Sequence, residues 1–290
     1  MKLGVIFPQT EIGDDAGAIR EFAQTSEELG YEHILAYDHV LGADPAKHPD
    51  WGGLYTMESA FHEPFVLFGY LAAVTSAIKL TTGIIILPQR QTALVAKQAA
   101  AVDVLSNGRM RLGVGLGWNR VEYEALGQDF HNRGRRVEEQ VALLRKLWTE
   151  ESVDFAGQWH TVSGAGLNPM PVQRPIPIWM GGGADPVLRR VATLADGWLP
   201  QAQMDDAGRQ HIQKMCDYAR EAGRDPADIE ICARMNPARI PESEWAAAVE
   251  WWKETGATQL DAVTMGAGYT SVDQHIDVIR RFKEVADSVN

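Results

Sequence analysis

The sequence predicts an α/β protein built as a single (β/α)8 TIM barrel with insertion loops at its C-terminal face. Eight short apolar segments, typical of buried strands, alternate along the chain with eight longer segments whose apolar residues recur three and four positions apart, as in amphipathic helices. Eight such repeats within 290 residues match a closed barrel. No linker or change in composition marks a second domain, so residues 1–290 are expected to form one unit. A doubly wound open sheet is the alternative that the same alternation allows.

Each predicted strand is followed by one predicted helix, which is the repeat of a parallel sheet. The strands are expected at the apolar runs Leu3–Phe7, His33–Tyr37, Leu80–Ile86, Arg109–Leu116, Ile176–Met180, Gly197–Pro200, Ile229–Ala233 and Leu260–Thr264. The helices are expected at the amphipathic segments Ala16–Leu29, Pro64–Ala77, Ala93–Leu105, Arg133–Trp148, Pro186–Ala195, Asp206–Ala222, Glu242–Thr255 and Val272–Ser288.

The segment from Lys79 to Trp118 shows this repeat most clearly. It reads KLTTGIIILPQRQTALVAKQAAAVDVLSNGRMRLGVGLGW, which is strand, loop, helix, tight turn and strand. A right-handed crossover makes the two strands parallel. The polar residues that follow them, Gln89 and Arg90 after the first and Trp118 and Asn119 after the second, should therefore emerge at the same edge. A ligand is expected at that edge, which in a barrel is the C-terminal face.

Composition narrows the class of protein. Hydrophobic residues make up 45% of the chain, charged residues 23%, and the formal net charge is −12. This charge argues against nucleic acid or an anionic membrane as a partner. No apolar run approaches the roughly 20 residues of a membrane span, and the opening MKLGVIFPQ resembles a strand, so a cytoplasmic location is expected. Cys216 and Cys232 are expected to be reduced core residues, with neither a disulfide nor a metal site.

The long connection from Val40 to Glu63 is a candidate lid. It carries Trp51, Tyr55 and His62 among glycines and prolines, a mixture suited to covering an organic substrate. The alternative is a surface excursion packed by its own aromatic rings, and the sequence leaves both interpretations open. A second long connection, residues 151–175, contains FAGQWHTVSG, which predicts a short hairpin.

Asp38 and His39 directly follow the second predicted strand and are the candidate catalytic residues. At the mouth of a barrel, a histidine can bond a heteroaromatic ring or move a proton near neutral pH. The alternative is a pair that only closes the loop. The spacing of these residues and of His62 and Glu63 matches no common zinc pattern, so a metal hydrolase is not favoured.

Gly181, Gly182 and Gly183 lie between a predicted strand and a predicted helix. Glycines at such a junction let the backbone approach a ligand, and the helix N-terminus favours an anion, most simply a phosphate. Arg189 and Arg190 follow one turn later and could add positive charge. The alternative interpretation is a plain turn.

The segment after the fourth predicted strand reads GLGWNRVEYE. Gly117 could leave space for a flat ring, and Trp118 is a large aromatic residue expected to pack on a ligand at the barrel mouth. Asn119 could cap the next helix, with Glu122 three residues later as in a capping arrangement. For Asn119 and Glu122, the structural and functional interpretations therefore remain equally open.

With these segments in view, the chain resembles the luciferase-like monooxygenase superfamily. These are bacterial-luciferase-type TIM barrels that use FMN or the deazaflavin coenzyme F420, and the similarity is greatest to the actinobacterial F420-dependent branch. The segments that carry the resemblance are KLGVIFP, AYDHVL, KLTTGIIILPQR, LSNGRMRLGVGLGWNRVEYEALGQDFHNRGRRVEEQVALLRKLW and RPIPIWMGGGADPVLRRVATLADGWLP.

The resemblance implies roles for particular residues. Gly83 and Ile84 match a bulge in the third strand, commonly with a cis peptide, that supports the centre of the cofactor ring. His39 matches a histidine near the reactive face of the ring, and the three glycines match a phosphate-binding turn. Two positions depart from the F420-dependent sugar-phosphate dehydrogenases, since Trp118 stands where they carry glutamate and Ala43 where they carry an aromatic residue.

The function implied is an oxidoreductase that transfers hydride between coenzyme F420 and a small organic substrate. The substrate would lie under the 40–63 loop, and His39 would protonate or orient the reacting group. The alternatives are a monooxygenase that uses reduced FMN and O2 and a non-catalytic flavin-binding barrel. Family members usually dimerise, which implies a homodimer through the apolar helices Pro64–Ala77 and Ala93–Leu105.

Overall fold

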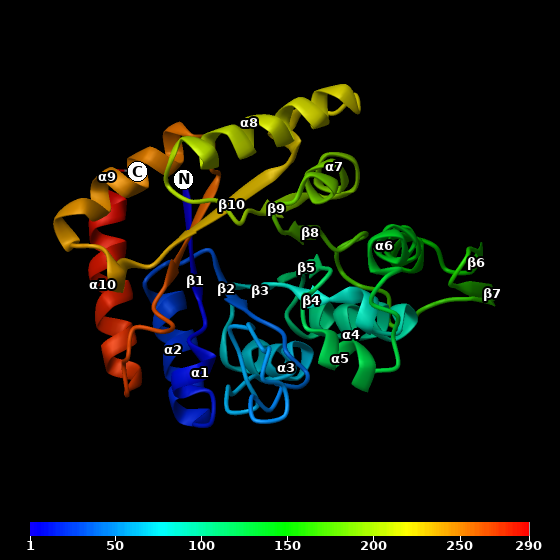
Figure 1. Ribbon diagram of the computed structural model, residues 1–290, viewed down its shortest axis with the longest axis horizontal. Coiled ribbons are helices and arrows are strands. Elements are labelled where there is room, and N and C mark those ends of the chain that lie inside the picture. The colour runs from blue at the N-terminus through cyan, green and yellow to red at the C-terminus, as the bar shows by residue number, and fades with distance from the viewer. Residues whose placement is uncertain (290) are drawn as a thin grey trace.

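Eight parallel strands close into a barrel in the computed structural model, which describes residues 1–289. Their order is β1, β2, β3, β5, β8, β9, β10 and β11, and the barrel closes because β11 pairs with β1 and β3 with β5 (Figure 1). The strands are β1 Lys2–Ile6, β2 His33–Ala36, β3 Lys79–Thr82 with its continuation β4 Ile85–Ile86, β5 Met110–Gly115, β8 Ile178–Gly181, β9 Gly197–Leu199, β10 Glu230–Met235 and β11 Gln259–Val263. The predicted closed (β/α)8 barrel is confirmed.

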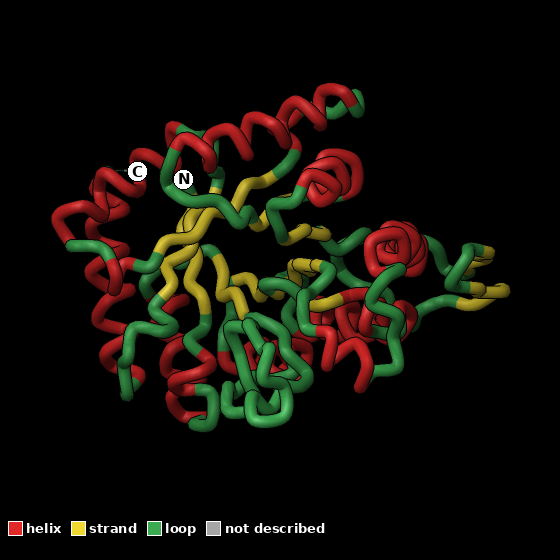
Figure 2. Tube along the Cα trace, viewed as in Figure 1, coloured by secondary structure: helices red, strands yellow, loops and turns green. Residues whose placement is uncertain are grey.

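Helices surround the strands, and the 40–63 segment forms the large loop region below them (Figure 2). The helices are α1 Gln9–Ile12, α2 Ala16–Glu28, α3 Pro64–Val74, α4 Thr92–Leu105, α5 Arg120–Ala125, α6 Arg133–Thr149, α7 Asp185–Leu194, α8 Asp206–Glu221, α9 Trp245–Glu254 and α10 Val272–Ser288. The predicted hairpin is confirmed as β6 Val153–Ala156 and β7 Thr161–Ala165. No helix within residues 1–289 is long and apolar enough to cross a membrane.

The bulge that the resemblance implied in the third strand is confirmed, since residues 83 and 84 separate β3 from β4 and the peptide between them is cis. Two predicted helices needed correction. The helix predicted to end at Ala77 ends at Val74, since Thr75 is extended and the Glu27 carboxylate accepts the backbone N–H groups that follow. The helix predicted from Glu242 begins at Trp245, because residues 242–244 form a 3₁₀ turn. The short helix α1 was not predicted, and α5 begins directly after Asn119, the residue expected to cap a helix there.

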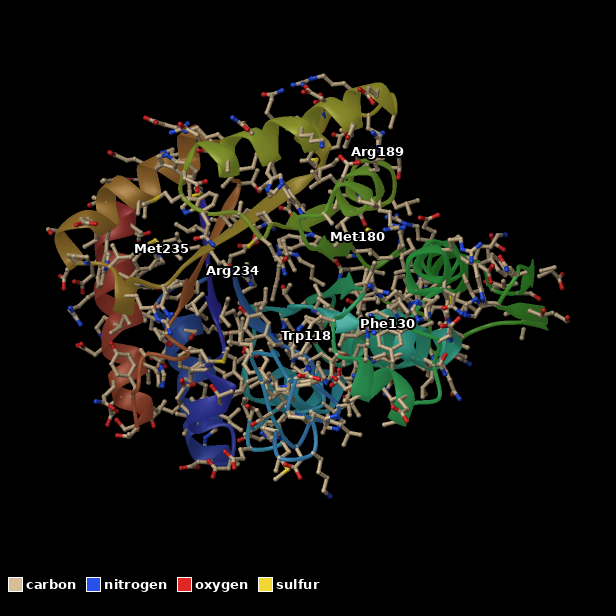
Figure 3. The ribbon with its side chains drawn as sticks, in the orientation of Figure 1. Trp118, Phe130, Met180, Arg189, Arg234 and Met235 are labelled. Carbon is tan, nitrogen blue, oxygen red and sulfur yellow. The ribbon has the colours of Figure 1, made fainter. Side chains whose placement is uncertain are left out.

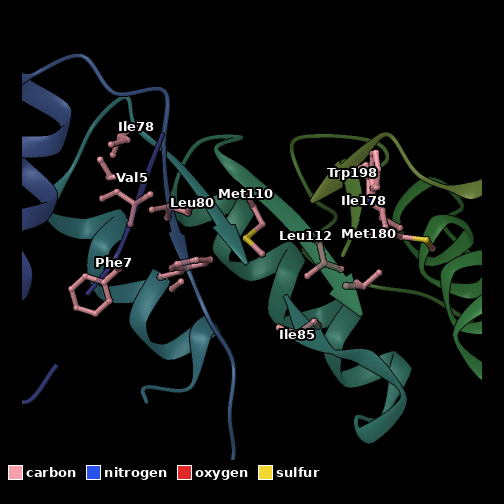
Figure 4. Packing of buried hydrophobic residues seen from close by; sticks show 14 of the residues in the cluster. Val5, Phe7, Ile78, Leu80, Ile85, Met110, Leu112, Ile178, Met180 and Trp198 are labelled. Atoms are coloured by element: carbon pink, nitrogen blue, oxygen red, sulfur yellow. The ribbon is translucent and has the colours of Figure 1, made fainter. Parts of the chain in front are cut away.

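The main apolar core lies between the strands and the helices. Alternate strand residues such as Val5, Leu80, Met110, Leu112 and Ile178 are buried in this layer (Figure 4). Because neighbouring residues of a strand face opposite sides, the intervening residues line the barrel interior. Several of these are polar and buried, namely His33, Thr81, Arg111, Cys232, Gln259 and Asp261. The barrel is therefore apolar on its outside and polar within.

Glycines in β5 leave room for the interrupted third strand. A Cβ atom added at Gly113 would overlap the carbonyl oxygen of Thr82 on β3. A Cβ atom at Gly115 would overlap the Ile84 side chain. Both neighbours are fixed parts of the barrel wall, so β5 needs a residue without a side chain at each position.

Gly113→Ala should therefore destabilise the protein. Over-packing a tight interior typically costs about 1–3 kcal/mol, and here the obstacle is backbone rather than a movable side chain. Urea denaturation measures the change. Gly69→Ala is the matched control, because no atom lies within 4 Å of its added Cβ and alanine favours the interior of α3. Equal stability of the two variants would contradict this account of β5.

Candidate functional site

The cis peptide between Gly83 and Ile84 places a half-exposed apolar side chain at the C-terminal face. Ile84 lies against Gly115 of β5 and Gly181 of β8, where a Cβ atom added to Gly181 would be only 2.9 Å from the Ile84 side chain. On its other side, Gly83 abuts the Leu35 side chain, where an added Cβ would overlap. The result is an apolar platform between glycines, which suits contact with a flat ring.

His39 is held by a buried carboxylate that lies on a different part of the chain. Its Nδ1 lies 3.2 Å from Oε1 of Glu122, which has no exposed surface. The same oxygen accepts the backbone N–H of Val40 at 2.8 Å and of Leu41 at 3.2 Å, and the Gln89 amide donates to the other oxygen at 3.4 Å. Since Glu122 acts as an acceptor throughout, Nδ1 of His39 carries the hydrogen and Nε2 is left to act on a ligand.

The capping interpretation therefore holds for Asn119 but not for Glu122. Asn119 caps α5 without help from Glu122, because the Asn119 side-chain oxygen accepts the N–H groups of Val121 and Glu122. The Asn119 amide also donates to the Leu41 carbonyl at 3.1 Å. Glu122 turns away from this cap towards the 40–63 loop. The sequence left a capping and a functional interpretation of Glu122 equally open, and its contact with His39 and its burial in α5 favour the functional one.

Two aromatic rings of the loop and the ring of Trp118, which follows β5, pack around His39. The His39 ring lies 5.2 Å from Tyr55, 4.9 Å from Phe61 and 5.6 Å from Trp118, measured between centroids. Trp51 packs on Trp118 at 5.3 Å. Burial raises the pKa of Tyr55 to about 12, so its hydroxyl stays protonated at neutral pH. The aromatic side chains of the loop therefore pack on one another, as in a self-packed surface loop. They also cover His39, as a lid would.

Two cavities lie under this loop. The larger, about 700 Å³, is lined by Trp51, Trp118, Lys47, His48, Leu54 and Arg120, among others. The smaller, about 220 Å³, is lined by His39, Tyr55 and Phe61 with neighbouring loop residues. Trp51 and Tyr55 therefore each line a cavity, and their role as a substrate lid remains a prediction. His62 does not join them, because its Nε2 contacts the carbonyl oxygen of Gly13.

Asp38 has a different environment from His39. Its carboxylate is buried, binds the Arg90 guanidinium at 2.8 Å and accepts the backbone N–H of Ile86 at 3.2 Å. Arg90 in turn binds Glu63 at 2.7 Å. Burial raises the pKa of Asp38, and the positive charge of Arg90 opposes that rise. The observed bonds make Asp38 a brace between the strand ends and the loop, and a catalytic role remains a prediction.

The three glycines form the predicted turn between β8 and α7. Gly182 has a φ of +125° and donates its N–H to the Leu199 carbonyl, while its own carbonyl accepts from Trp198. A Cβ atom added at Gly183 would make ordinary contacts with Gln201 and His211 at 3.6–3.7 Å, so a small side chain would fit there without overlap. Phosphate binding at this turn remains a prediction.

Less positive charge is available near this turn than the sequence suggested. Arg189 pairs with Asp185 at 3.3 Å, and Arg190 pairs with Glu138 at 2.7 Å. The Lys214 side chain also binds Asp185 and, with the Tyr218 hydroxyl, lowers the pKa of that carboxyl to about 2. The carboxylates of Asp185 and Glu138 therefore neutralise part of the positive charge near the turn.

Arg234 is a further residue at this face that the sequence did not indicate. Arg234 lies on β10, yet its side chain is exposed. The guanidinium donates a hydrogen bond to the Tyr37 hydroxyl. No carboxylate within residues 1–289 forms an ion pair with Arg234. Figure 3 shows Arg234 and Trp118 approaching the middle of the molecule from opposite sides. A cation without an acidic partner is thus available to a ligand at this face.

Comparison with known families matches residues 1–281 to the model described as luciferase-like monooxygenase. The chain belongs to this family. An uncharacterized protein of Mycobacterium tuberculosis H37Rv is 34% identical over 215 residues, 72% of this chain and 74% of its own length. A pyrimidine monooxygenase of Bradyrhizobium is 28% identical over 265 residues, 88% of this chain and 69% of its own. The solved structure of an F420-dependent secondary alcohol dehydrogenase aligns with a TM-score of 0.80 at 19% identity, covering 100% of this chain and 99% of that one.

In this luciferase-like barrel the brace formed by Asp38 and Arg90 is a testable feature. Arg90→Met should lower the free energy of unfolding by about 3 kcal/mol, because it leaves the buried Asp38 carboxylate without its cation. Urea denaturation of both proteins measures the difference. Arg220→Met breaks an exposed pair with Asp217 and should cost no more than about 1 kcal/mol. If Arg90→Met cost no more than this control, the brace would contribute no net stability.

Proposed function

We propose that this luciferase-like protein transfers hydride between coenzyme F420 and a small organic substrate. The observation that carries the proposal is the pairing of His39 with the buried Glu122, which leaves Nε2 of a histidine at the C-terminal ends of the strands free to act on a ligand. A bound deazaflavin would supply the hydride chemistry, and the platform fits such a ring because glycines flank Ile84 on both sides. Gly117, Trp118 and the turn at 181–183 would hold the rest of the cofactor.

The chain's own residues would prepare the substrate for reaction. Glu122 fixes the hydrogen of His39 on Nδ1, so Nε2 can accept a proton from a substrate hydroxyl or, once protonated, return one to a carbonyl oxygen. The Tyr55 ring packs against His39, and its hydroxyl could donate a hydrogen bond to the substrate. Rings from Trp51, Phe61 and Trp118 would exclude water around the reacting group.

A second candidate function is oxygenation with reduced FMN. It is supported by relatives whose names specify monooxygenases, including an FMNH2-dependent dimethylsulfone monooxygenase of Pseudomonas putida that is 28% identical over 244 residues. The compensated charge near Arg189 and Arg190 also weakens the argument from a polyanionic cofactor tail. A flavin-binding barrel without activity is a third possibility, against which the pairing of His39 with a buried carboxylate argues.

Cofactor titration separates these functions. Purified protein is titrated with F420 and with FMN, oxidised and reduced, following the fluorescence of each. Tight binding of F420 alone would support hydride transfer. Preference for reduced FMN would instead support oxygenation, and binding of neither would contradict both.

His39→Gln should lower kcat by about 10²- to 10⁴-fold, the usual contribution of a positioned acid or base, while cofactor affinity stays unchanged. Glu122→Gln should lower kcat more than it changes KM, because the His39 hydrogen is no longer fixed. Stopped-flow oxidation or reduction of the bound cofactor with an accepted substrate measures both. Glu124→Gln, an exposed neighbour on α5, should match the wild type. Unchanged turnover in His39→Gln would refute the proton-transfer role.

We further propose that the chain forms a homodimer through α3 and α4. Both helices expose large apolar side chains, with Val66 at 70%, Leu94 at 51% and Leu105 at 69% of their full exposure. Such surface is typical of interfaces between subunits. Val66→Lys combined with Leu94→Glu should convert a dimer to a monomer in sedimentation velocity, while Val172→Lys at an exposed site elsewhere should not. A monomeric wild type at micromolar concentration would exclude this assembly.

A further inference from the structure

Three potential metal ligands from three separate strands meet inside the barrel. His33 lies on β2, Cys232 on β10 and Asp261 on β11, and all three are buried. A ligand atom from each lies within 4.8 Å of the other two. The cluster is deeper than the candidate active site, because Leu35, two residues beyond His33 on β2, already lies against Gly83.

A glycine in β1 makes this meeting possible. β1 runs between β2 and β11, and Gly4 is in register with His33 on one side and Asp261 on the other. A Cβ atom at Gly4 would overlap Asp261 Oδ1 and lie 2.5 Å from His33 Nε2. The absent side chain therefore allows the imidazole and the carboxylate to approach each other across β1.

The ligand atoms converge and satisfy one another only in part, since Cys232 and His33 share a long hydrogen bond while His33 Nδ1 has no partner within residues 1–289. His33 Nε2 lies 2.9 Å from Asp261 Oδ1 and 4.0 Å from Cys232 Sγ. Asp261 Oδ1 nevertheless has no hydrogen-bond partner within residues 1–289, so the 2.9 Å contact lacks the alignment of a hydrogen bond. Buried carboxylate oxygens are rarely left unpaired. Separations of this size occur between ligands that share one ion at about 2.0–2.3 Å.

We propose that His33, Cys232 and Asp261 bind a zinc ion. Thiolate, imidazole and carboxylate are the ligands that zinc takes in proteins, and the second Asp261 oxygen or a water molecule would complete a tetrahedron. A dication with one thiolate, one carboxylate and a neutral imidazole has no net charge, which suits a fully buried position. The positive charge of Arg111, which reaches Cys232, is paired with Glu230 at 3.7 Å.

The ion would be structural, since it would join β2, β10 and β11 inside the barrel. This proposal is independent of the proposed function. It also differs from the expectation drawn from the sequence, in which no metal spacing was visible. The three ligands lie far apart along the chain, and only closure of the barrel brings them together. Because the site is buried, the ion would enter during folding.

Metal analysis of the full chain tests the proposal. Protein unfolded in denaturant and chelator, then refolded with Zn²⁺ and freed of excess metal, should hold about one Zn²⁺ per chain by mass spectrometry. Refolding with Co²⁺ should give a thiolate-to-cobalt charge-transfer band in the near ultraviolet. Cys232→Ser should lose that band and at least about tenfold of the metal content, whereas Cys216→Ser, the matched control, should keep both.

The wild type alone can overturn the proposal. If refolded wild-type protein holds no Zn²⁺ and shows no cobalt–thiolate band, the cluster is a metal-free polar group. A band that survives Cys232→Ser and disappears in Cys216→Ser would place the metal elsewhere. Should Cys232→Ser fail to fold, Asp261→Asn serves in its place, since it keeps the size of the side chain and should still weaken metal retention. Cofactor titration of the same samples reports on the other site separately.

Discussion

The interrupted third strand is the constraint on which the site depends. β3 pairs with the lower part of β5 and β4 with its upper part, and Ile84 between them lies against Gly115 and Gly181. Gly113, Gly115 and Gly181 leave space for the interrupted strand. A side chain at Gly113 would overlap the backbone of β3, and one at Gly115 or Gly181 would displace the Ile84 side chain. The same glycines flatten the surface around Ile84, so the packing that closes the barrel also shapes the face a ring could use.

Charged side chains that are wholly or partly buried hold the two ends of the 40–63 loop. Glu122 accepts two backbone N–H groups at the start of the loop, and Arg90 joins Glu63 at its end to Asp38 beneath it. Burying carboxylates is unfavourable unless each is satisfied, and here each has several donors. These bonds are stronger and more directional than apolar contacts, so they fix where the loop begins and ends. The aromatic rings between the two anchors can then pack over His39.

The sequence was sufficient for the elements and for some residues of the site. Hydrophobic period and the alternation of strands and helices depend on local sequence, so the barrel and the position of His39 at a strand end followed directly. The partnership of His39 with Glu122 did not, because it joins residues 83 positions apart and α5 gives no local signal beyond a capping pattern. The pairing of Arg190 with Glu138, 52 positions away, was hidden for the same reason, whereas the pairing of Arg189 with Asp185 four residues earlier was visible in the sequence. Contacts made by closure of the barrel need the structure.

The outer and inner faces of the barrel strands contribute differently to the fold. Apolar residues on the outer faces of the strands pack beneath the helices and supply most of the buried hydrophobic surface, so the interior need not be apolar to stabilise the fold. Polar groups placed there must be satisfied by one another, by water or by an ion. Leu35, two residues beyond His33, lies against Gly83 of the platform, and Tyr37, the next inward residue of the same segment, bonds to Arg234 and lies near Asp261 and Cys232. One strand end therefore connects the lower polar cluster to the residues of the upper site.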